Sequence, residues 1–325
     1  MLVTPHNKIN NYRLIYYMKN IWNFIKVFIV VCLVVYWIYL YKNINIERFD
    51  NVSTTIEPTE LPYNIWMYWE NKEGKDKPTY LNLCYKTILK NCPKFKIRLL
   101  DEKSVKKFLP ELRNDLDSKL ERIPMKTDYI RYNLLHKYGG IWLDSDIIVF
   151  KDLSEIINKL KKYEYVGFGC HGGDNKCKAS MNGYPKPANW VMISRRNSLL
   201  LEKCIKKADN LLDIHDSNYF NTHYHILGRN LIWESIQEIK SKNKNWDYLH
   251  MSSKCIERDS KGRKYTNKVN MTMENVDEYC KENMFFMPIY NTAPGFPSWF
   301  LDLSETEILN STILISKHIR KALGL

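Results

Sequence analysis

The chain has 325 residues, which is enough for one large domain or two small ones in addition to a membrane anchor. Hydrophobic residues make up 45% of it and aromatic residues 13%, values that are typical of a packed globular protein and exclude an intrinsically disordered chain. The formal net charge of +13 comes from lysines spread along the sequence, which indicates a solvated surface or a polyanionic partner. Because no helix-turn-helix, zinc-finger or RNP-like pattern accompanies this charge, we expect no nucleic-acid partner.

An apolar segment near the N-terminus predicts a membrane anchor. Residues 27–41 read VFIVVCLVVYWIYLY without a charge, and extension back to Ile21 reaches about 20 residues, the length of a membrane-spanning helix. Four basic residues and no acidic residue precede this run, so the positive-inside rule places the N-terminus in the cytosol. A cleavable signal peptide is the alternative, but the run ends in bulky aromatic residues without a small-residue cleavage site.

This interpretation makes the chain a single-pass type II membrane protein. The predicted parts are a cytosolic tail at 1–20, a transmembrane signal anchor at 21–41, a polar stem at 42–60 and a folded domain at 61–325. The folded domain would lie on the lumenal or extracytoplasmic side, in a Golgi- or ER-like compartment if the cell is eukaryotic or the host of a virus. Glycosylation sequons begin at Asn51, Asn270 and Asn310, and they support this topology only weakly.

The eight cysteines bear on the same question of compartment. They include no CxxC pair and no Cys/His ligand set, so a structural zinc site is not expected. Cys170 and Cys177 bracket a Gly-rich loop and are able to pair in an oxidising compartment, but the sequence leaves the disulfide connectivity open.

The predicted elements alternate between strands and helices as far as residue 150. In chain order they are a strand at 63–69, a helix at 78–91 that begins at Pro78, a strand at 96–100, a helix at 102–109 capped by Asp101, a helix at 125–138 that ends at Gly139-Gly140, and a strand at 141–150. Strands at 163–168 and 189–194 and helices at 198–212 and 226–240 follow. This order predicts an α/β fold with a sheet of mainly parallel strands.

Two carboxylates, Asp144 and Asp146, interrupt the strand at 141–150. Alternate residues of a strand share one face, and if the strand ends here the pair projects from the carboxyl edge of the sheet, where open α/β sheets bind ligands. Two like charges this close need to be neutralised, and a divalent cation does so while it also binds phosphate oxygens. Oxygen ligands favour Mg²⁺ or Mn²⁺ over zinc, although an acidic pair of this kind also occurs on ordinary surface loops.

A second pair of charged residues lies on the helix that precedes this strand. Asp128 and Arg131 are one helical turn apart and therefore share a face. They form either an ordinary surface ion pair, which stabilises a protein little, or a pair that the helix presents to a ligand beside the carboxylates. Gly139 and Gly140 allow the chain to turn tightly from the helix into the strand.

Residues 127–146 read TDYIRYNLLHKYGGIWLDSD. The segment resembles the glycosyltransferases with a DxD-containing sugar-binding region, a group that includes yeast-type mannosyltransferases and bacterial capsular polysaccharide synthesis proteins. It is also similar to the catalytic domains of the large clostridial glucosylating toxins. The shared pattern is Ser/Thr-Asp-x-x-Arg followed by a Gly-Gly pair, an aromatic residue and Leu-Asp-x-Asp, with Trp142 here where Tyr is common. The likeness runs from about residue 61 to 155 and is weaker to about residue 240.

The resemblance implies a GT-A-like nucleotide-sugar fold. It also implies metal-dependent transfer of a hexose from a UDP- or GDP-linked donor to a glycan or glycoconjugate acceptor, with retention of configuration. Residues 61–155 would form the donor- and metal-binding part of the domain, and residues 156–325 its acceptor side.

The same resemblance assigns roles to individual residues. Trp69 would stack on the donor base, Asp128, Arg131 and Trp142 would bind the rest of the donor, and Asp144 and Asp146 would be the catalytic and metal-binding pair. Asp144 would reach the ribose or the metal through water, and Asp146 would bind the metal directly.

The C-terminal half carries weaker signals. Related enzymes often supply a further metal ligand from this half, and His225 is our prediction for it, with His223 and His318 as other candidates and an ordinary surface histidine as the alternative. Residues 285–300 (FFMPIYNTAPGFPSWF) are rich in aromatic residues and proline, as an acceptor-binding loop or a packed loop would be.

Two other functions compete with sugar transfer. A haloacid-dehalogenase-like phosphatase also places Asp-x-Asp after an apolar strand, but it needs Thr or Val where Ile148 stands here. A non-catalytic, membrane-tethered glycan-binding protein would keep the fold without turnover, and the intact carboxylates argue against it.

Overall fold

The computed structural model describes residues 60–71, 75–169, 186–252, 285–289 and 296–325, together with Cys32 and Tyr36. The chain divides into the units Met1–Thr59 and Glu60–Leu325, and the fold below is that of the second unit. Within the described ranges no helix is long and apolar enough to cross a lipid bilayer. The predicted tail, anchor and stem lie outside the described residues except for Cys32, Tyr36 and Glu60, as does the loop between Cys170 and Cys177, so these features stay predictions.

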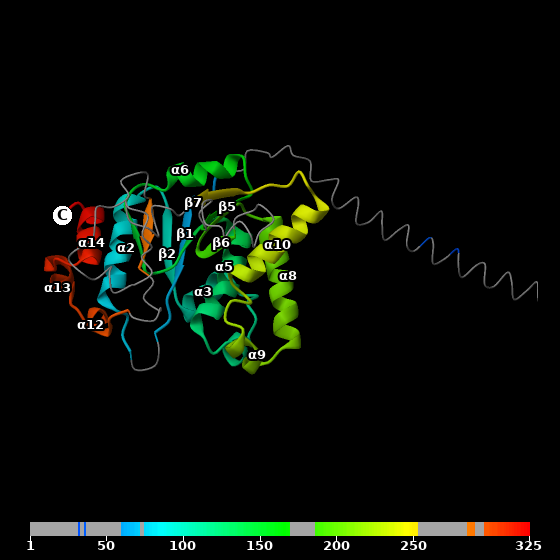
Figure 1. The fold of residues 1–325 in the computed structure, drawn as a ribbon, viewed down its shortest axis with the longest axis horizontal. Helices are drawn as coiled ribbons and strands as arrows, with labels where there is room; N and C mark the ends of the chain where they lie inside the picture. Colours follow the sequence, from blue (N-terminus) through cyan, green and yellow to red (C-terminus); the bar gives the residue numbers. More distant parts are fainter. Residues whose placement is uncertain are drawn as a thin grey trace, which may run out of the picture. The chain divides into compact units, whose positions relative to one another are not determined.

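A six-stranded mixed sheet lies at the centre of the unit, with the strand order β2-β1-β3-β6-β5-β7 (Figure 1). Its strands are β1 (Asn64–Tyr68), β2 (Lys96–Leu100), β3 (Gly140–Leu143), β5 (Tyr165–Gly169), β6 (Pro187–Ser194) and β7 (Leu249–Ser252). A two-stranded antiparallel sheet of β4 (Ile147–Val149) and β8 (Phe286–Pro288) adjoins it. The predicted α/β class is confirmed, and the predicted strand at 96–100 has the bounds of β2.

The direction of the strands changes at β6. β1 pairs in parallel with both β2 and β3, as predicted for the part before residue 150. β6 runs antiparallel to β3 and to β5, whereas β5 pairs in parallel with β7. The described sheet is therefore mixed, but β6 is its one reversed strand, and the prediction of mainly parallel strands is confirmed. A parallel strand needs a crossover connection, and β6 instead pairs directly with the strand that precedes it.

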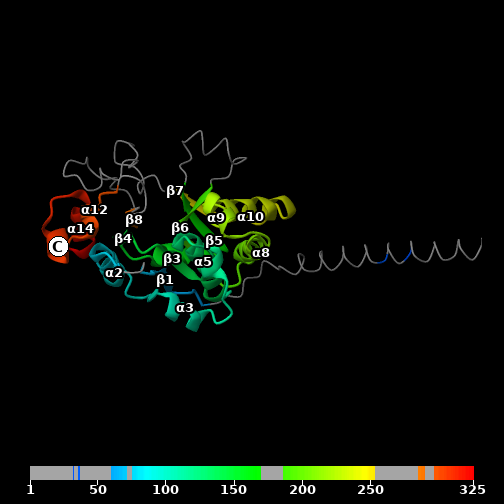
Figure 2. The same ribbon diagram turned by 90° about the horizontal axis from the view of Figure 1, so that it is seen from below.

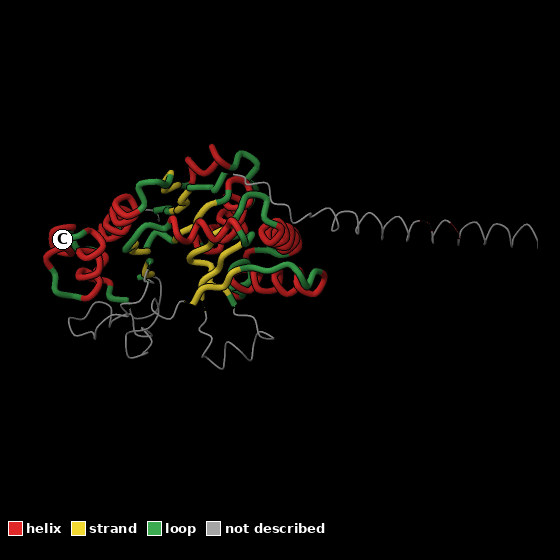
Figure 3. The backbone as a smooth tube through the Cα atoms, turned by 90° about the horizontal axis from the view of Figure 1, so that it is seen from above, coloured by secondary structure: helices red, strands yellow, loops and turns green. Residues whose placement is uncertain are grey.

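Helices cover both faces of the sheet. They are α2 (Thr79–Asn91), α3 (Glu102–Phe108), α4 (Leu116–Lys119), α5 (Ile123–Tyr138), α6 (Ser154–Ile157), the 3₁₀ helix η1 (Asn158–Lys161), α8 (Leu199–Ile214), α9 (Ser217–Thr222), α10 (Arg229–Lys242), α12 (Ser298–Leu301), α13 (Glu305–Asn310) and α14 (Leu314–Leu323). Figures 1 and 2 show α8, α9 and α10 at one end of the unit and α2, α12 and α14 at the other. The strands lie between these groups (Figure 3).

Alternation along the strands builds two apolar layers. Trp66 and Trp142 point to the face that α3, α5, α8 and α10 cover. Ile65, Ile141 and Leu143 point to the opposite face, where they pack with α6, η1 and β8. A side-chain period of two produces this division, and it buries both faces of the central strands.

The predicted turn between α5 and β3 is confirmed. Gly139 and Gly140 have φ values of 64° and 109°, which side chains rarely tolerate, and the Gly139 N–H donates to the Leu135 carbonyl oxygen at 2.8 Å. A Cβ atom on Gly140 would lie 2.5 Å from the Asn64 carbonyl oxygen. The two glycines therefore let α5 return closely onto β1 and set β3 beside it.

Candidate active site

The Asp144-Ser145-Asp146 segment lies where β3 ends and forms the turn into β4. The Asp144 N–H donates to the Trp190 carbonyl oxygen at 3.0 Å, and the Ser145 hydroxyl donates to the Tyr68 carbonyl oxygen at 2.8 Å. The Asp146 carbonyl oxygen accepts from the Ile289 N–H at 2.9 Å. The two carboxylates therefore follow the strand, which ends at Leu143. The prediction that they share one face of a strand is wrong, but their position at the carboxyl edge of the sheet agrees with the prediction.

A buried charged group lies beside this turn. Nη2 of Arg131 lies 3.2 Å from Oδ1 of Asp128 and 3.4 Å from Oδ1 of Asp144, and the Arg131 side chain is only 3% exposed. Asn189 on β6 donates its amide N–H to Oδ1 of Asp128 at 2.7 Å, while its carbonyl oxygen accepts from Arg131. The interpretation of Asp128 and Arg131 as an ordinary surface pair is therefore wrong, because both residues are buried and Arg131 also contacts Asp144 at the end of β3.

Burial and charge oppose each other within this group. Burial raises the pKa of Asp128 to about 6, and the nearby charge of Arg131 and the amide of Asn189 only partly offset that rise. Burial acts to lower the pKa of Arg131, but the charges of Asp144 and Asp128 raise it above its ordinary value. The guanidinium therefore stays charged between two carboxylates.

Trp142 supports the site from a buried position. Its side chain is fully buried, its indole N–H donates to Oδ1 of Asp144 at 2.8 Å, and the guanidinium carbon of Arg131 lies 5.0 Å from the centre of its ring. Its large ring orients Asp144 and Arg131. The predicted contact of Trp142 with the donor stays a prediction.

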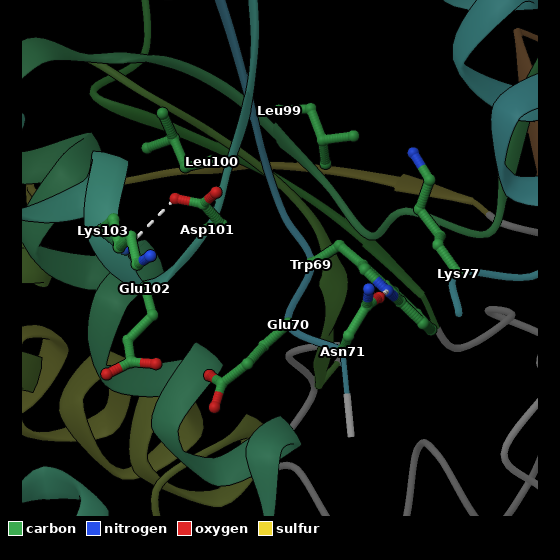
Figure 4. Close-up of a pocket in the computed structure, with 9 residues that line it drawn as sticks. All are labelled: Trp69, Glu70, Asn71, Lys77, Leu99, Leu100, Asp101, Glu102 and Lys103. Carbon is green, nitrogen blue, oxygen red and sulfur yellow. Dashed lines mark hydrogen bonds between the residues drawn. The ribbon is translucent and has the colours of Figure 1, made fainter. Parts of the chain in front are cut away.

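Trp69 borders a cavity of about 540 Å³ at the carboxyl ends of β1 and β2 (Figure 4). The cavity is lined by Trp69, Glu70, Asn71, Lys77, Leu99, Leu100, Asp101, Glu102 and Lys103. Because β2, β1 and β3 are parallel neighbours, their carboxyl ends lie at one edge of the sheet, and the bond from Ser145 to the Tyr68 carbonyl joins the ends of β3 and β1 directly. The cavity therefore lies at the same edge of the sheet as the Asp144 turn, although no residue of that turn lines it.

Lys126 links the wall of this cavity to α5. Its ammonium group donates to Glu70 at 2.9 Å and to Asp117, and the residue is 4% exposed. The hydroxyl of Tyr68 also donates to Glu70, at 2.7 Å. Since Lys126 precedes Asp128 by two residues, the same helix fixes the cavity wall and the charged group.

The predicted third metal ligand is not brought to the carboxylates. The ranges that the structure describes contain no group of three or more His, Cys, Asp or Glu side chains able to hold a metal ion. Burial and the charges of Arg229 and Lys186 lower the pKa of His225. Of the other candidates, His318 is buried with its ring 5.9 Å from the Phe150 ring, and His223 stacks on Tyr219.

The described parts of the aromatic segment at 285–300 are mainly packed in the interior. Phe286 and Phe300 are fully buried, whereas Trp299 is half-exposed. Residues 290–295 lie outside the described ranges, so a role of this part in acceptor binding stays a prediction.

Sequence reasoning missed Asn189 and Gly228. Asn189 lies in a segment that the sequence marks only as an apolar strand, and Gly228 precedes α10 without any motif. Both meet Asp128 through contacts between distant parts of the chain, for which one sequence carries no local signal.

The fold and the site fit an enzyme of the glycosyltransferase class: a mixed α/β sheet carries an Asp-x-Asp turn and a buried Asp-Arg pair at its carboxyl edge. The chain matches the family described as capsular polysaccharide synthesis protein over residues 37–254, more than half of its length. It belongs to this family. No curated protein matches the chain significantly in sequence.

Solved glycosyltransferases are similar in structure. The apo form of GlyE from Streptococcus pneumoniae TIGR4 gives a TM-score of 0.41 at 13% identity, over 80% of this chain and 60% of GlyE. The galactosyltransferase LgtC in complex with donor and acceptor sugar analogues gives 0.39 at 14% identity, over 81% and 96%. The catalytic domain of α-toxin from Clostridium novyi gives 0.33 at 11% identity, over 84% and 74%. These likenesses are distant, so the family match carries the identification.

Proposed function

We propose that the protein transfers a hexose from a UDP- or GDP-linked donor to a glycan or glycoconjugate acceptor, with retention and with help from a divalent metal ion. The observation that supports this most is the position of the Asp128–Arg131–Asp144 group at the same sheet edge as the cavity bounded by Trp69. A nucleotide-sugar needs both features, because its base requires a flat apolar surface and its sugar requires hydrogen-bonding groups.

The donor would lie along the carboxyl edge of the sheet. Its base would occupy the cavity against the Trp69 ring, whose indole N–H is held by Asn71 at 2.8 Å. Its sugar would contact Asp128 and Arg131. The Asp128 carboxylate would accept hydrogen bonds from sugar hydroxyls, and the Arg131 guanidinium would donate hydrogen bonds to oxygen atoms of the donor. Trp142 and Asn189 would keep these groups in place, since each bonds a member of the charged group.

The two carboxylates of the turn fit a hard cation. Oδ1 of Asp144 is occupied by Trp142 and Arg131, while Oδ2 accepts no hydrogen bond from the described residues, and 32% of the side chain is exposed. Asp144 and Asp146 would hold Mn²⁺ or Mg²⁺, with phosphate oxygens of the donor completing its ligands. When bound, the ion would act as a Lewis acid on the leaving diphosphate.

The predicted N-terminal anchor completes the proposal. It would tether the enzyme to a membrane with the catalytic domain on the lumenal or extracytoplasmic side. Proteolysis of sealed vesicles tests this directly: the folded domain should be protected, and its cleavage from the cytosolic side would contradict the topology.

Nucleotide release tests the proposed reaction. The full-length protein would be incubated with a panel of UDP- and GDP-sugars in Mn²⁺, Mg²⁺ or EDTA, and slow, metal-dependent release of one nucleotide is expected. Asp146→Asn is the companion variant, because it removes a charged ligand at constant volume and should abolish release while the fold persists. If no donor is hydrolysed and none shifts the melting temperature, the non-catalytic glycan-binding alternative is favoured.

A further inference from the structure

Gly228, the residue before α10, lies directly against the Asp128 carboxylate. A Cβ atom on Gly228 would lie 2.7 Å from Oδ2 of Asp128 and 2.9 Å from Nδ2 of Asn189. A side chain at this position would therefore lack space. The Tyr132 hydroxyl donates to the Leu227 carbonyl oxygen at 2.6 Å and the Gly228 carbonyl oxygen at 3.1 Å, so this backbone is fixed onto α5.

Asn189 holds the other side of the same carboxylate. Its amide N–H donates to Oδ1 of Asp128, and its own backbone carbonyl oxygen accepts from Arg131. One residue of β6 therefore contacts both members of the ion pair. Asp128 is enclosed by three elements: its own helix α5, strand β6 and the start of α10.

We propose that Asn189 and Gly228 are positioning residues that hold Asp128 in one rotamer for binding of the donor sugar. Asn189 fixes Oδ1, and the bare backbone of Gly228 closes against Oδ2. A side chain at position 228 would push the carboxylate away from Asn189 and Arg131, whose hydrogen bonds it needs inside the protein. The functional part of this inference rests on the proposed function, in which Asp128 binds the sugar.

Donor kinetics test the functional part in the full-length protein. Gly228→Ala and Asn189→Ala should each raise the donor KM about tenfold, the effect expected when a charge-assisted hydrogen bond is displaced, and change kcat less. Glu234→Ala is the control, since this residue lies on the exposed face of the same helix and should leave the KM unchanged. An unchanged donor KM in both Gly228→Ala and Asn189→Ala would overturn the inference, whether or not kcat falls.

Urea denaturation tests the contact itself without any substrate. Gly228→Ala should lower the denaturation midpoint of the otherwise wild-type protein by more than it lowers that of Asp128→Ala, in which the carboxylate is gone and the close contact with Asn189 remains. An equal fall of the denaturation midpoint in both backgrounds would show that Gly228 acts independently of Asp128. That result would refute the proposed positioning of Asp128 by Gly228. If the wild-type protein hydrolyses no donor, the proposed function fails. The denaturation of the single and double variants still measures the contact between Gly228 and Asp128.

Discussion

Asp128 should make the stability of the protein depend on pH in a way that one substitution removes. Its pKa is raised by burial from the ordinary 3.8 to about 6. Between these values the folded protein holds the proton more tightly than the unfolded chain does. The free energy of unfolding therefore falls as the pH rises through this window, and the ionised carboxylate lowers it by about 3 kcal/mol at pH 7.

Asp128→Asn replaces the carboxylate by a neutral group of almost equal volume. The amide oxygen can still accept from Asn189, and Arg131 keeps Asp144 as its ionic partner. We therefore expect the variant to lack the part of the pH dependence that belongs to Asp128. Of the total effect, about 2 kcal/mol falls between pH 4.5 and 7.5, because the unfolded carboxyl is already mostly ionised at the lower pH.

Urea denaturation of the full-length wild type and variant at several pH values measures this difference. The wild type should lose about 2 kcal/mol more than Asp128→Asn over that range, whatever the offset between the two curves. Asp213→Asn, which removes a carboxylate whose side chain is 60% exposed, provides the control and should follow the wild type. Parallel curves for wild type and Asp128→Asn would refute the raised pKa of Asp128.

Two further substitutions separate the site from the scaffold. Trp142→Phe keeps an aromatic ring under Arg131 but removes the N–H that Asp144 accepts, so donor hydrolysis should fall about tenfold with little change in secondary structure by circular dichroism. Asp101→Ala removes the cap that accepts from the Lys103 and Ser104 N–H groups at the start of α3, and should lower the free energy of unfolding by about 1 kcal/mol in urea denaturation.

The parts of the fold that the sequence predicts are those that local chemistry decides. Pro78 begins α2, Asp101 caps α3, and Gly139 ends α5, as predicted, because each acts within one turn of its own element. The run KIRLL became β2 with unchanged bounds because a short β-rich segment between turn residues has few alternatives.

The parts that were missed depend on contacts between distant segments. The reversal of β6 depends on which neighbour the strand meets, and its apolar sequence suits either direction. Periodicity predicted that Asp144 and Asp146 share a strand face, but the strand stops at Leu143 because the chain crosses there to a second sheet. The bond between Asn189 and Asp128 joins residues 61 positions apart, and nothing local marks it.

The charge balance of the site affects both the free energy of folding and the proposed binding of a donor. Asp128 and Asp144 share one guanidinium, Arg131, so the group carries an excess negative charge in surroundings that disfavour it. The proposed donor would supply what the group lacks, because sugar hydroxyls donate hydrogen bonds to carboxylates and a divalent cation would offset charge at the Asp144 end. Burial raises the pKa of Asp128, and a buried carboxyl with a raised pKa at this edge of the sheet supports the proposed site.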